Sequence, residues 1–172
     1  GASRSLFTQG YRHLFAVLST SEQYLASSIA LAAELAEKEG RSPSSLRAAL
    51  VFENDPFSLD VRAGVLDDMK QYGIKTVIDD KMPRDLSDIS ATLTKVKALR
   101  PDLLILSGHS KGAATAARQI KEMQIQVPII AMTHCEAAKV ISKFGSSSNG
   151  YLCPTQWAET LSYSDNLFGS AS

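Results

Sequence analysis

Five apolar runs of strand length alternate with amphipathic stretches along this chain, and that alternation limits the folds open to it. The runs span residues 46–52, 74–78, 103–106, 127–132 and 151–153. Strands that are apolar along their whole length need cover on both faces, and strands that alternate with helices form parallel sheets. The pattern therefore predicts the α/β class, with a three-layer αβα sandwich around a mainly parallel, Rossmann-like sheet.

Turn chemistry marks the ends of the helices expected between these runs. Ser19 and Glu22 have the spacing of a capping box, and Gly40 ends the helix that they would begin. A second helix is expected from about residue 56 to Gly73. Further helices are expected over about 85–100, from about 110, and over about 136–144. Residues 14–18 read as one more strand, placed before the first helix.

Composition limits the partners of the chain. Its 18 basic and 18 acidic residues cancel, so we expect no nucleic-acid partner. The 172 residues, 44% of them hydrophobic, suit one compact domain. Cys135 and Cys153 match no zinc spacing, and the sequence leaves open whether they pair. Because the chain starts on Gly1 rather than methionine, we expect it to be a piece of a longer protein.

Ligands of an open parallel sheet bind outside the carboxyl ends of its strands, and the residues there form the candidate site. They are Glu53, Asn54, Asp55, Phe57, Asp79, Asp80, Ser107, His109, Ser110, Thr133, His134, Cys135, Gln156 and Trp157. Polar and aromatic side chains of this kind are typical of a crevice for a small molecule.

The G-H-S-K-G stretch at 108–112 raises the alternative of a serine hydrolase with Ser110 as its nucleophile. A nucleophile elbow needs an acid and then a histidine later in the chain. After Ser110 only Glu122 and then His134 have that order, and Glu122 falls midway along a helix, away from the strand ends. We therefore expect no catalytic residue, and we expect Ser110 to cap the helix that follows.

A zinc site would use His109 and His134, with Cys135, Asp55 or Cys153 completing it. Each of these ligands comes from a separate loop, without the local spacing of known zinc motifs. No G-x-G-x-x-G or Walker sequence follows the first strand either. We therefore expect neither a metal nor another cofactor.

Residues 46–131 carry a diffuse pattern that suggests a family. A strand leads into N-D-x-F at 54–57, D-L-S at 85–87 precedes LTKVKALRPD, and G-x-x-x-G-A follows the next strand. Together these resemble the second lobe of type I periplasmic solute-binding proteins of ABC importers, the group of the leucine/isoleucine/valine-binding protein. The resemblance runs from about Ser3 to Trp157. It implies that 1–18 is a remnant of the first-lobe ligand loop and the crossing strand, 19–160 the second lobe, and 161–172 a truncated tail.

The same resemblance implies a set of ligand-binding residues. Gly1, Ala2 and Ser3 match the small-residue loop of the first lobe, while Asn54 and Phe57 fall on the N-D-x-F turn. His109 stands where the branched-chain amino-acid binders have tyrosine, and His134 where they have glutamate. The ligand-binding set is therefore Ala2, Ser3, Asn54, Phe57, His109 and His134. Because histidine supplies no fixed negative charge, a carboxylate or amide solute rivals a free amino acid.

The resemblance implies a protein that is not an enzyme. It would bind a small solute between two hinged lobes, deliver it to an ABC permease, and reside in the periplasm after loss of a signal peptide. The isolated lobe would self-associate through its exposed surface. A ligand-sensing module of a receptor or regulator with the same fold is the remaining alternative, beside the hydrolase.

Overall fold

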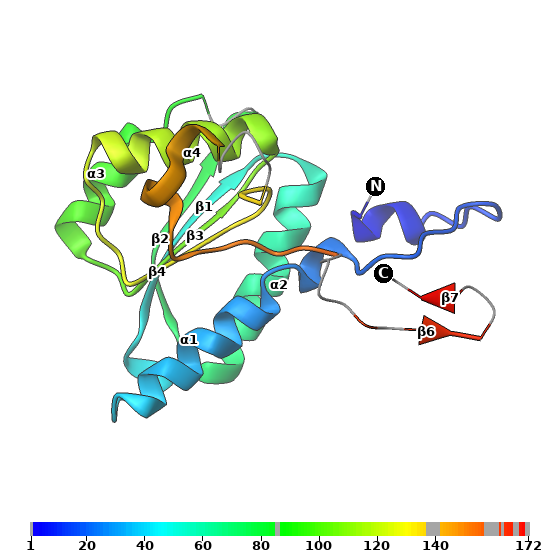
Figure 1. Ribbon diagram of the computed structural model, residues 1–172, viewed down its shortest axis with the longest axis horizontal. Coiled ribbons are helices and arrows are strands. Elements are labelled where there is room, and N and C mark those ends of the chain that lie inside the picture. The colour runs from blue at the N-terminus through cyan, green and yellow to red at the C-terminus, as the bar shows by residue number, and fades with distance from the viewer. Residues whose placement is uncertain are drawn as a thin grey trace.

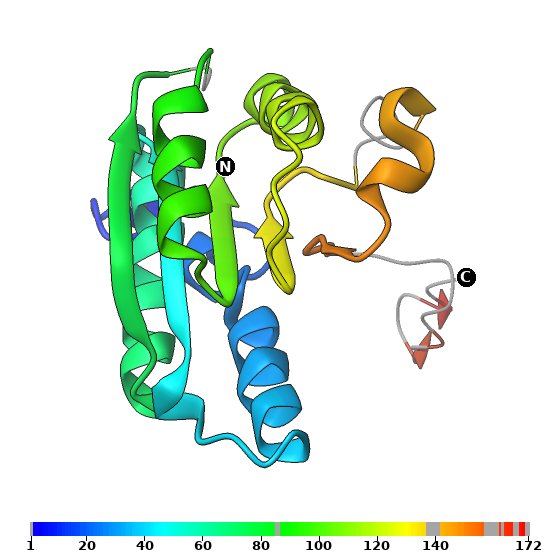
Figure 2. The same cartoon turned by 90° about the vertical axis from the view of Figure 1, so that its left-hand side faces the viewer.

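The computed structural model describes residues 2–84, 87–136, 142–156, 162, 164–166 and 169–170. Its centre is a five-stranded, wholly parallel sheet in the order β2-β1-β3-β4-β5 (Figures 1 and 2). The strands are β1 (Arg47–Glu53), β2 (Lys75–Met82), β3 (Leu103–Ser107), β4 (Ile129–Met132) and β5 (Tyr151–Leu152). The five apolar runs of the sequence thus all become strands of one sheet, and the prediction of a mainly parallel sheet is confirmed.

Helices cover both faces of this sheet and complete a three-layer αβα sandwich (Figure 1). They are α1 (Ala26–Lys38), α2 (Pro56–Tyr72), α3 (Ser90–Leu99) and α4 (Ser110–Glu122). Side chains of α1 and α2 share one core cluster, and side chains of α3 and α4 share the other. Among the described residues, no helix combines the length and the apolar character that a membrane crossing needs.

The central strand β1 shows why the sheet needs two covers. Ala48, Leu50 and Phe52 pack in the cluster of α1 and α2, whereas Ala49 and Val51 pack in that of α3 and α4. All five side chains are fully buried. Because successive side chains of a strand point to opposite faces, an unbroken apolar strand supplies both cores.

Helix α2 begins and ends where local chemistry predicts. The Asp55 side chain caps it by accepting hydrogen bonds from the backbone N–H groups of Phe57 (2.9 Å) and Ser58 (3.3 Å). Gly73 ends the helix in the left-handed conformation, with φ of 69°. The cap fixes the direction in which the chain leaves β1, and it therefore fixes the place of Phe57.

Three expected helix ends differ from the structure. The capping box at Ser19 and Glu22 does not form, because a short 3-10 helix (Ser21–Gln23) occupies this stretch and α1 starts only at Ala26. Helix α3 starts at Ser90 rather than near 85. At this start the Asp88 side chain accepts a hydrogen bond from the Ser90 N–H. Ser110 is the first residue of α4, and its cap position is held by His109 without a side-chain bond.

The strand expected at 14–18 is absent, so that prediction is wrong. These residues form no sheet in the described part of the chain, and Phe15 and Val17 are 85% and 105% exposed. An apolar stretch becomes a strand only when a neighbouring strand supplies backbone partners. The expected helix at 136–144 falls largely on residues 137–141, which lie outside the described residues.

Shorter elements complete the chain. They are the 3-10 helices at Arg4–Phe7, Pro43–Ser45 and Gly145–Ser148, and the antiparallel strands β6 (Ser164–Asp165) and β7 (Gly169–Ser170).

Candidate functional site

Four aromatic rings from four separate segments meet at the carboxyl edge of the sheet. Tyr24 follows the Ser21–Gln23 helix, Phe57 lies in the first turn of α2, His109 precedes α4, and His134 follows β4. The ring centroid of Phe57 lies 5.4 Å from that of Tyr24, 5.7 Å from that of His109 and 5.5 Å from that of His134. The two imidazoles are 5.8 Å apart. Phe57 is therefore the centre of this aromatic cluster.

His109 is the exposed member of the cluster. Its side chain is 62% exposed, and its Nε2 lies 3.6 Å from Asp55 Oδ1. The backbone N–H of His109 points to Glu53 Oε2 at 3.4 Å. These contacts join the start of α4 to the end of β1, so the loop geometry presents the imidazole to solvent beside two acidic side chains.

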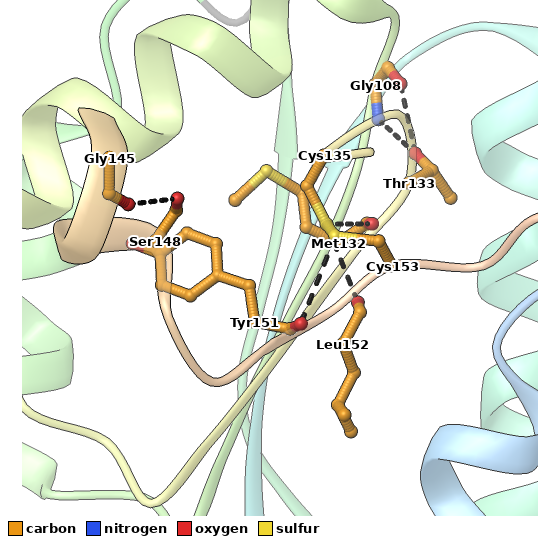
Figure 3. Close-up of a disulfide and its surroundings, with 9 residues drawn as sticks. All are labelled: Gly108, Met132, Thr133, Cys135, Gly145, Ser148, Tyr151, Leu152 and Cys153. Atoms are coloured by element: carbon orange, nitrogen blue, oxygen red, sulfur yellow. Dashed lines mark hydrogen bonds between the residues drawn. A yellow bond between two sulfur atoms is a disulfide. The ribbon is translucent and has the colours of Figure 1, made fainter. Parts of the chain in front are cut away.

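His134 is held more firmly. Its Nδ1 lies 2.8 Å from the carbonyl oxygen of Gly108, and its backbone adopts a left-handed φ of 61°. A non-glycine residue in that conformation needs support from its surroundings. The buried Thr133 supplies it, because its hydroxyl accepts from Gly108 N–H (3.2 Å) and lies 3.0 Å from Gly108 O (Figure 3). The loops after β3 and β4 are thereby locked together.

Cys135 and Cys153 form a disulfide, which answers the question that the sequence leaves open (Figure 3). The bridge ties the loop after β4 to the residue that follows β5. It adds a covalent anchor one residue beyond His134. Because both sulfurs are in this bond, neither cysteine is available as the zinc ligand considered above.

Beside the aromatic cluster lies a pocket of about 390 Å³, the acidic pocket, lined by Glu53, Asp55, Pro56, Arg84 and His109. Glu53 and Asp55 are only 1% and 6% exposed. Glu53 was among the strand-end residues but outside the predicted binding set. The signal that could have singled it out is an acidic residue directly after a strand of apolar side chains, where a buried charge needs a reason.

Tyr24 is a second residue that the sequence did not indicate. Burial raises the pKa of its phenol, and the nearby carboxylate of Glu136 raises that pKa further. Its edge-to-face contact with Phe57 depends on the packing of the Ser21–Gln23 helix against α2. No periodicity in the sequence marks a contact of that kind.

The other predicted residues take different places. Asn54 is exposed, and its backbone N–H donates to Met82 O at 2.8 Å. Ala2 and Ser3 are buried: Ala2 O accepts from the Ser21 N–H, and Ser3 Oγ donates to Asp60 Oδ2 of α2 at 2.5 Å. No hydrogen bond or ring contact among the described residues joins either one to the aromatic cluster. Gly1 and Trp157 lie outside the described residues.

Asp79 and Asp80 belong to the interior of β2 and are already engaged. Asp79 pairs with Arg62, and Asp80 accepts from Thr92 Oγ1 (2.6 Å) and Lys95 Nζ (2.9 Å). These two carboxylates stabilise the packing of α2 and α3 on the sheet, and neither lines the acidic pocket.

The geometry does not support a serine hydrolase. Glu122 lies at the far end of α4 from Ser110 and pairs with Arg118 at 2.8 Å. His134 turns its Nδ1 to a backbone carbonyl, and no hydrogen bond among the described residues joins Ser110 to an imidazole. The acid, base and nucleophile of a triad are therefore not assembled.

Comparisons with known proteins agree with this architecture. The periplasmic binding protein family matches residues 8–168. A leucine-binding protein from Thermotoga maritima shares the fold with a TM-score of 0.74 at 18% identity, over 94% of this chain and 44% of that chain. A fatty acid ABC transporter substrate-binding protein from Thermomonospora curvata gives 0.69 at 12% identity, over 84% and 36%.

A branched-chain amino acid ABC transporter protein from Thermus thermophilus, solved with bound valine, gives a TM-score of 0.63 at 14% identity, over 79% of this chain and 34% of that chain. The chain thus spans less than half the length of these solved structures. Substrate-binding proteins of this kind are not enzymes. With the family matched over 8–168 and the fold shared with these structures, the chain belongs to the periplasmic binding protein family.

Proposed function

We propose that this chain is the second lobe of the solute-binding component of an ABC importer, and that its aromatic cluster contacts the solute. The observation that carries the proposal is the meeting of Tyr24, Phe57, His109 and His134 at the carboxyl edge of the sheet. Ligands bind at that edge in open parallel sheets, and apolar rings with a few polar atoms are typical of small-molecule sites.

The solute in this proposal is an amino acid or a related carboxylate or amide. The stacked pair of Phe57 and His109 offers a flat surface to an apolar side chain, and the exposed imidazole of His109 offers a hydrogen bond. The similar solved proteins are named for leucine, valine and fatty acid, so the fold they share accepts more than one class of solute.

In this proposal residues 19–160 form the lobe, 1–18 lead in from a first lobe, and 161–172 lead out of it. The two lobes close on the solute about a hinge, with Ala2 and Ser3 carrying the ligand loop of the first lobe. Enclosure supplies the affinity, because the closed state buries the solute and is selected by it. One lobe offers half of the cleft, so the isolated chain binds weakly.

The proposed location is the periplasm or the cell exterior, with an ABC permease as the partner. Besides the family, the disulfide between Cys135 and Cys153 supports an oxidising compartment.

The test is calorimetric titration of the intact protein, including all chain before and after these residues, with leucine, isoleucine, valine, phenylalanine and aromatic carboxylates. We expect at least one to bind with a Kd of about 1 μM or tighter. The variant to compare with wild type is Phe57→Ala. It removes the centre of the aromatic cluster and should weaken binding of that solute. Absence of binding across these amino acids and carboxylates, and across their amides titrated in the same way, would refute the proposal.

A further inference from the structure

The acidic pocket gathers three side chains that are able to ligate a metal ion. Glu53, Asp55 and His109 each offer one ligand atom, and these atoms all lie within 4.8 Å of one another. We propose that Glu53, Asp55 and His109 form a binding site for a divalent transition-metal ion of the Zn²⁺ type. All three ligands come from this chain, so the site can be tested without a solute.

The geometry suits a small tetrahedral ion. Zn²⁺ binds imidazole nitrogen and carboxylate oxygen at about 2.0–2.2 Å, which puts neighbouring ligand atoms about 3.4 Å apart. His109 Nε2 lies 3.6 Å from Asp55 Oδ1, so the imidazole and this carboxylate adjoin. One ligand atom of Glu53 lies within 4.8 Å of those of Asp55 and His109, and the exposed side of His109 leaves a fourth position open to water.

Asp55 gives the second, independent observation. Its side chain is 7% exposed, and Oδ1 already caps α2 through the N–H groups of Phe57 and Ser58. Its other oxygen, Oδ2, is buried without a hydrogen-bond partner in the described part of the chain. A buried carboxylate oxygen that lacks a partner is costly, and a bound cation is the simplest way to satisfy it.

The side chains around Glu53, Asp55 and His109 suit a bound cation. Two carboxylates, those of Glu53 and Asp55, and the guanidinium of Arg84 line the pocket. The ring of Phe57 stacks on His109 at an angle of 29° and limits rotation of the imidazole. An imidazole ligand among oxygens selects a transition metal over Mg²⁺ or Ca²⁺.

This site differs from the zinc alternative that the sequence raised. That alternative used His109 and His134 with Cys135, Asp55 or Cys153. The two cysteines form a disulfide, and His134 Nδ1 lies against Gly108 O, so of that set only His109 and Asp55 belong to the site proposed here. That alternative also omitted Glu53. From the sequence no metal is expected, because the candidate ligands come from separate loops without the spacing of a known motif. The end of β1 nevertheless contributes two carboxylates within three residues.

The experiment is a calorimetric titration of the intact, solute-free protein with Zn²⁺ alone. We compare wild type with Glu53→Gln, Asp55→Asn and His109→Gln, and use His13→Gln as the control for an exposed histidine elsewhere. We expect one ion per chain and a Kd raised by at least about tenfold in each of the three variants, since even partners of metal ligands matter by that much. His13→Gln should bind like wild type.

Folding is checked by thermal unfolding without metal. Asp55→Asn retains a side chain that caps helices well, and His109 is exposed, so both variants should unfold at the wild-type temperature. The proposal is overturned if wild type binds no Zn²⁺, or if His109→Gln binds it as tightly as wild type. Because no solute is present, neither result bears on the solute-binding proposal.

Discussion

The ring of Phe57 stacks on the imidazole of His109 with centroids 5.7 Å apart and planes inclined by 29°. The two residues lie 52 positions apart in the chain, one in the first turn of α2 and the other at the start of α4. Their contact depends on β1 and β3 being direct neighbours, since each ring follows the carboxyl end of one of these strands. Sheet order therefore determines the surface that we propose contacts the solute.

We expect His109→Ala to weaken solute binding by the intact protein by about two- to tenfold, the range that one aromatic contact contributes. The measurement is calorimetric titration in a buffer that contains a chelator, so that metal binding does not interfere. Lys121→Ala, at the other end of α4, is the control and should leave the Kd unchanged. Equal affinity in His109→Ala and wild type would remove His109 from the binding surface.

Ser110→Ala should leave the protein unchanged in every assay. Ser110 is exposed at the first position of α4 and makes no side-chain capping bond there. Release of p-nitrophenol from p-nitrophenyl acetate, measured with both proteins, tests the hydrolase alternative. Turnover that is present in wild type and lost in Ser110→Ala would show that Ser110 is a nucleophile after all.

The sequence predicted the layers because burial on two faces leaves a strong pattern. Leu103, Leu104, Ile105 and Leu106 are each 1% exposed or less, and such a run fits only a covered strand. The same reasoning predicted a strand at 14–18, where the residues are equally apolar, and that prediction is wrong. Phe15 and Val17 have no strand beside them in the described part of the chain, and a sequence does not record whether a partner is present.

The site was predictable only in part. Phe57, His109 and His134 come from strand ends, whose position follows from periodicity, and the structure brings their rings together. Tyr24 reaches the cluster through contacts of a 3-10 helix with α2, and the partner of Cys135 depends on how β4 and β5 pair. These are tertiary contacts, and the local pattern of apolar and polar residues in the sequence does not predict them.

Acid should destabilise the protein partly through Asp79. Hydrogen bonds from the Arg62 guanidinium hold the pKa of the Asp79 carboxyl below its usual range. A lowered pKa in the folded state stabilises the fold above the unfolded pKa of about 3.9, and that contribution is lost as the pH falls further. Asp79→Asn should therefore lower the free energy of unfolding at pH 7 by about 1 kcal/mol or less, because the pair is partly exposed.

Urea unfolding at pH 7 and pH 3 checks this prediction. The difference between wild type and Asp79→Asn should shrink at pH 3, because that pH lies below the unfolded pKa of about 3.9, where the carboxyl of the unfolded chain is mostly protonated. Other acidic residues, such as Asp88, lose favourable contacts in both proteins and cancel in the comparison. A difference that is the same at both pH values would mean that the ion pair with Arg62 contributes nothing to acid sensitivity.

Removing the disulfide should loosen the loop that carries His134. Cys135 and Cys153 are 18 residues apart, and cross-linking a loop of that size stabilises a protein by about 3 kcal/mol. We expect Cys135→Ala combined with Cys153→Ala to lower the free energy of unfolding by about that amount and to weaken solute binding. Wild type treated with a reducing agent is the matched comparison. Unchanged stability in both samples would show that the bridge is dispensable.

Gly64→Ala should displace the segment that carries Tyr24. Gly64 is buried in α2, and a Cβ built on it would lie only 1.8 Å from the backbone oxygen of Glu22. Backbone atoms cannot yield as the tip of a side chain does, so the Ser21–Gln23 helix must move away from α2. We expect a loss of about 1–3 kcal/mol in the free energy of unfolding, as for other overpacked sites.

The greater helix propensity of alanine works in the opposite direction by about 1 kcal/mol, so a net loss would mean that the clash outweighs it. Asp67→Ala, an exposed change in the same helix, is the control and should alter stability by less than about 0.5 kcal/mol. Urea unfolding gives both values. Moving the helix also separates Tyr24 from Phe57, whose ring centroids are 5.4 Å apart, so Gly64→Ala should weaken solute binding as well. A variant as stable as wild type would show that α2 and this segment are not packed as described.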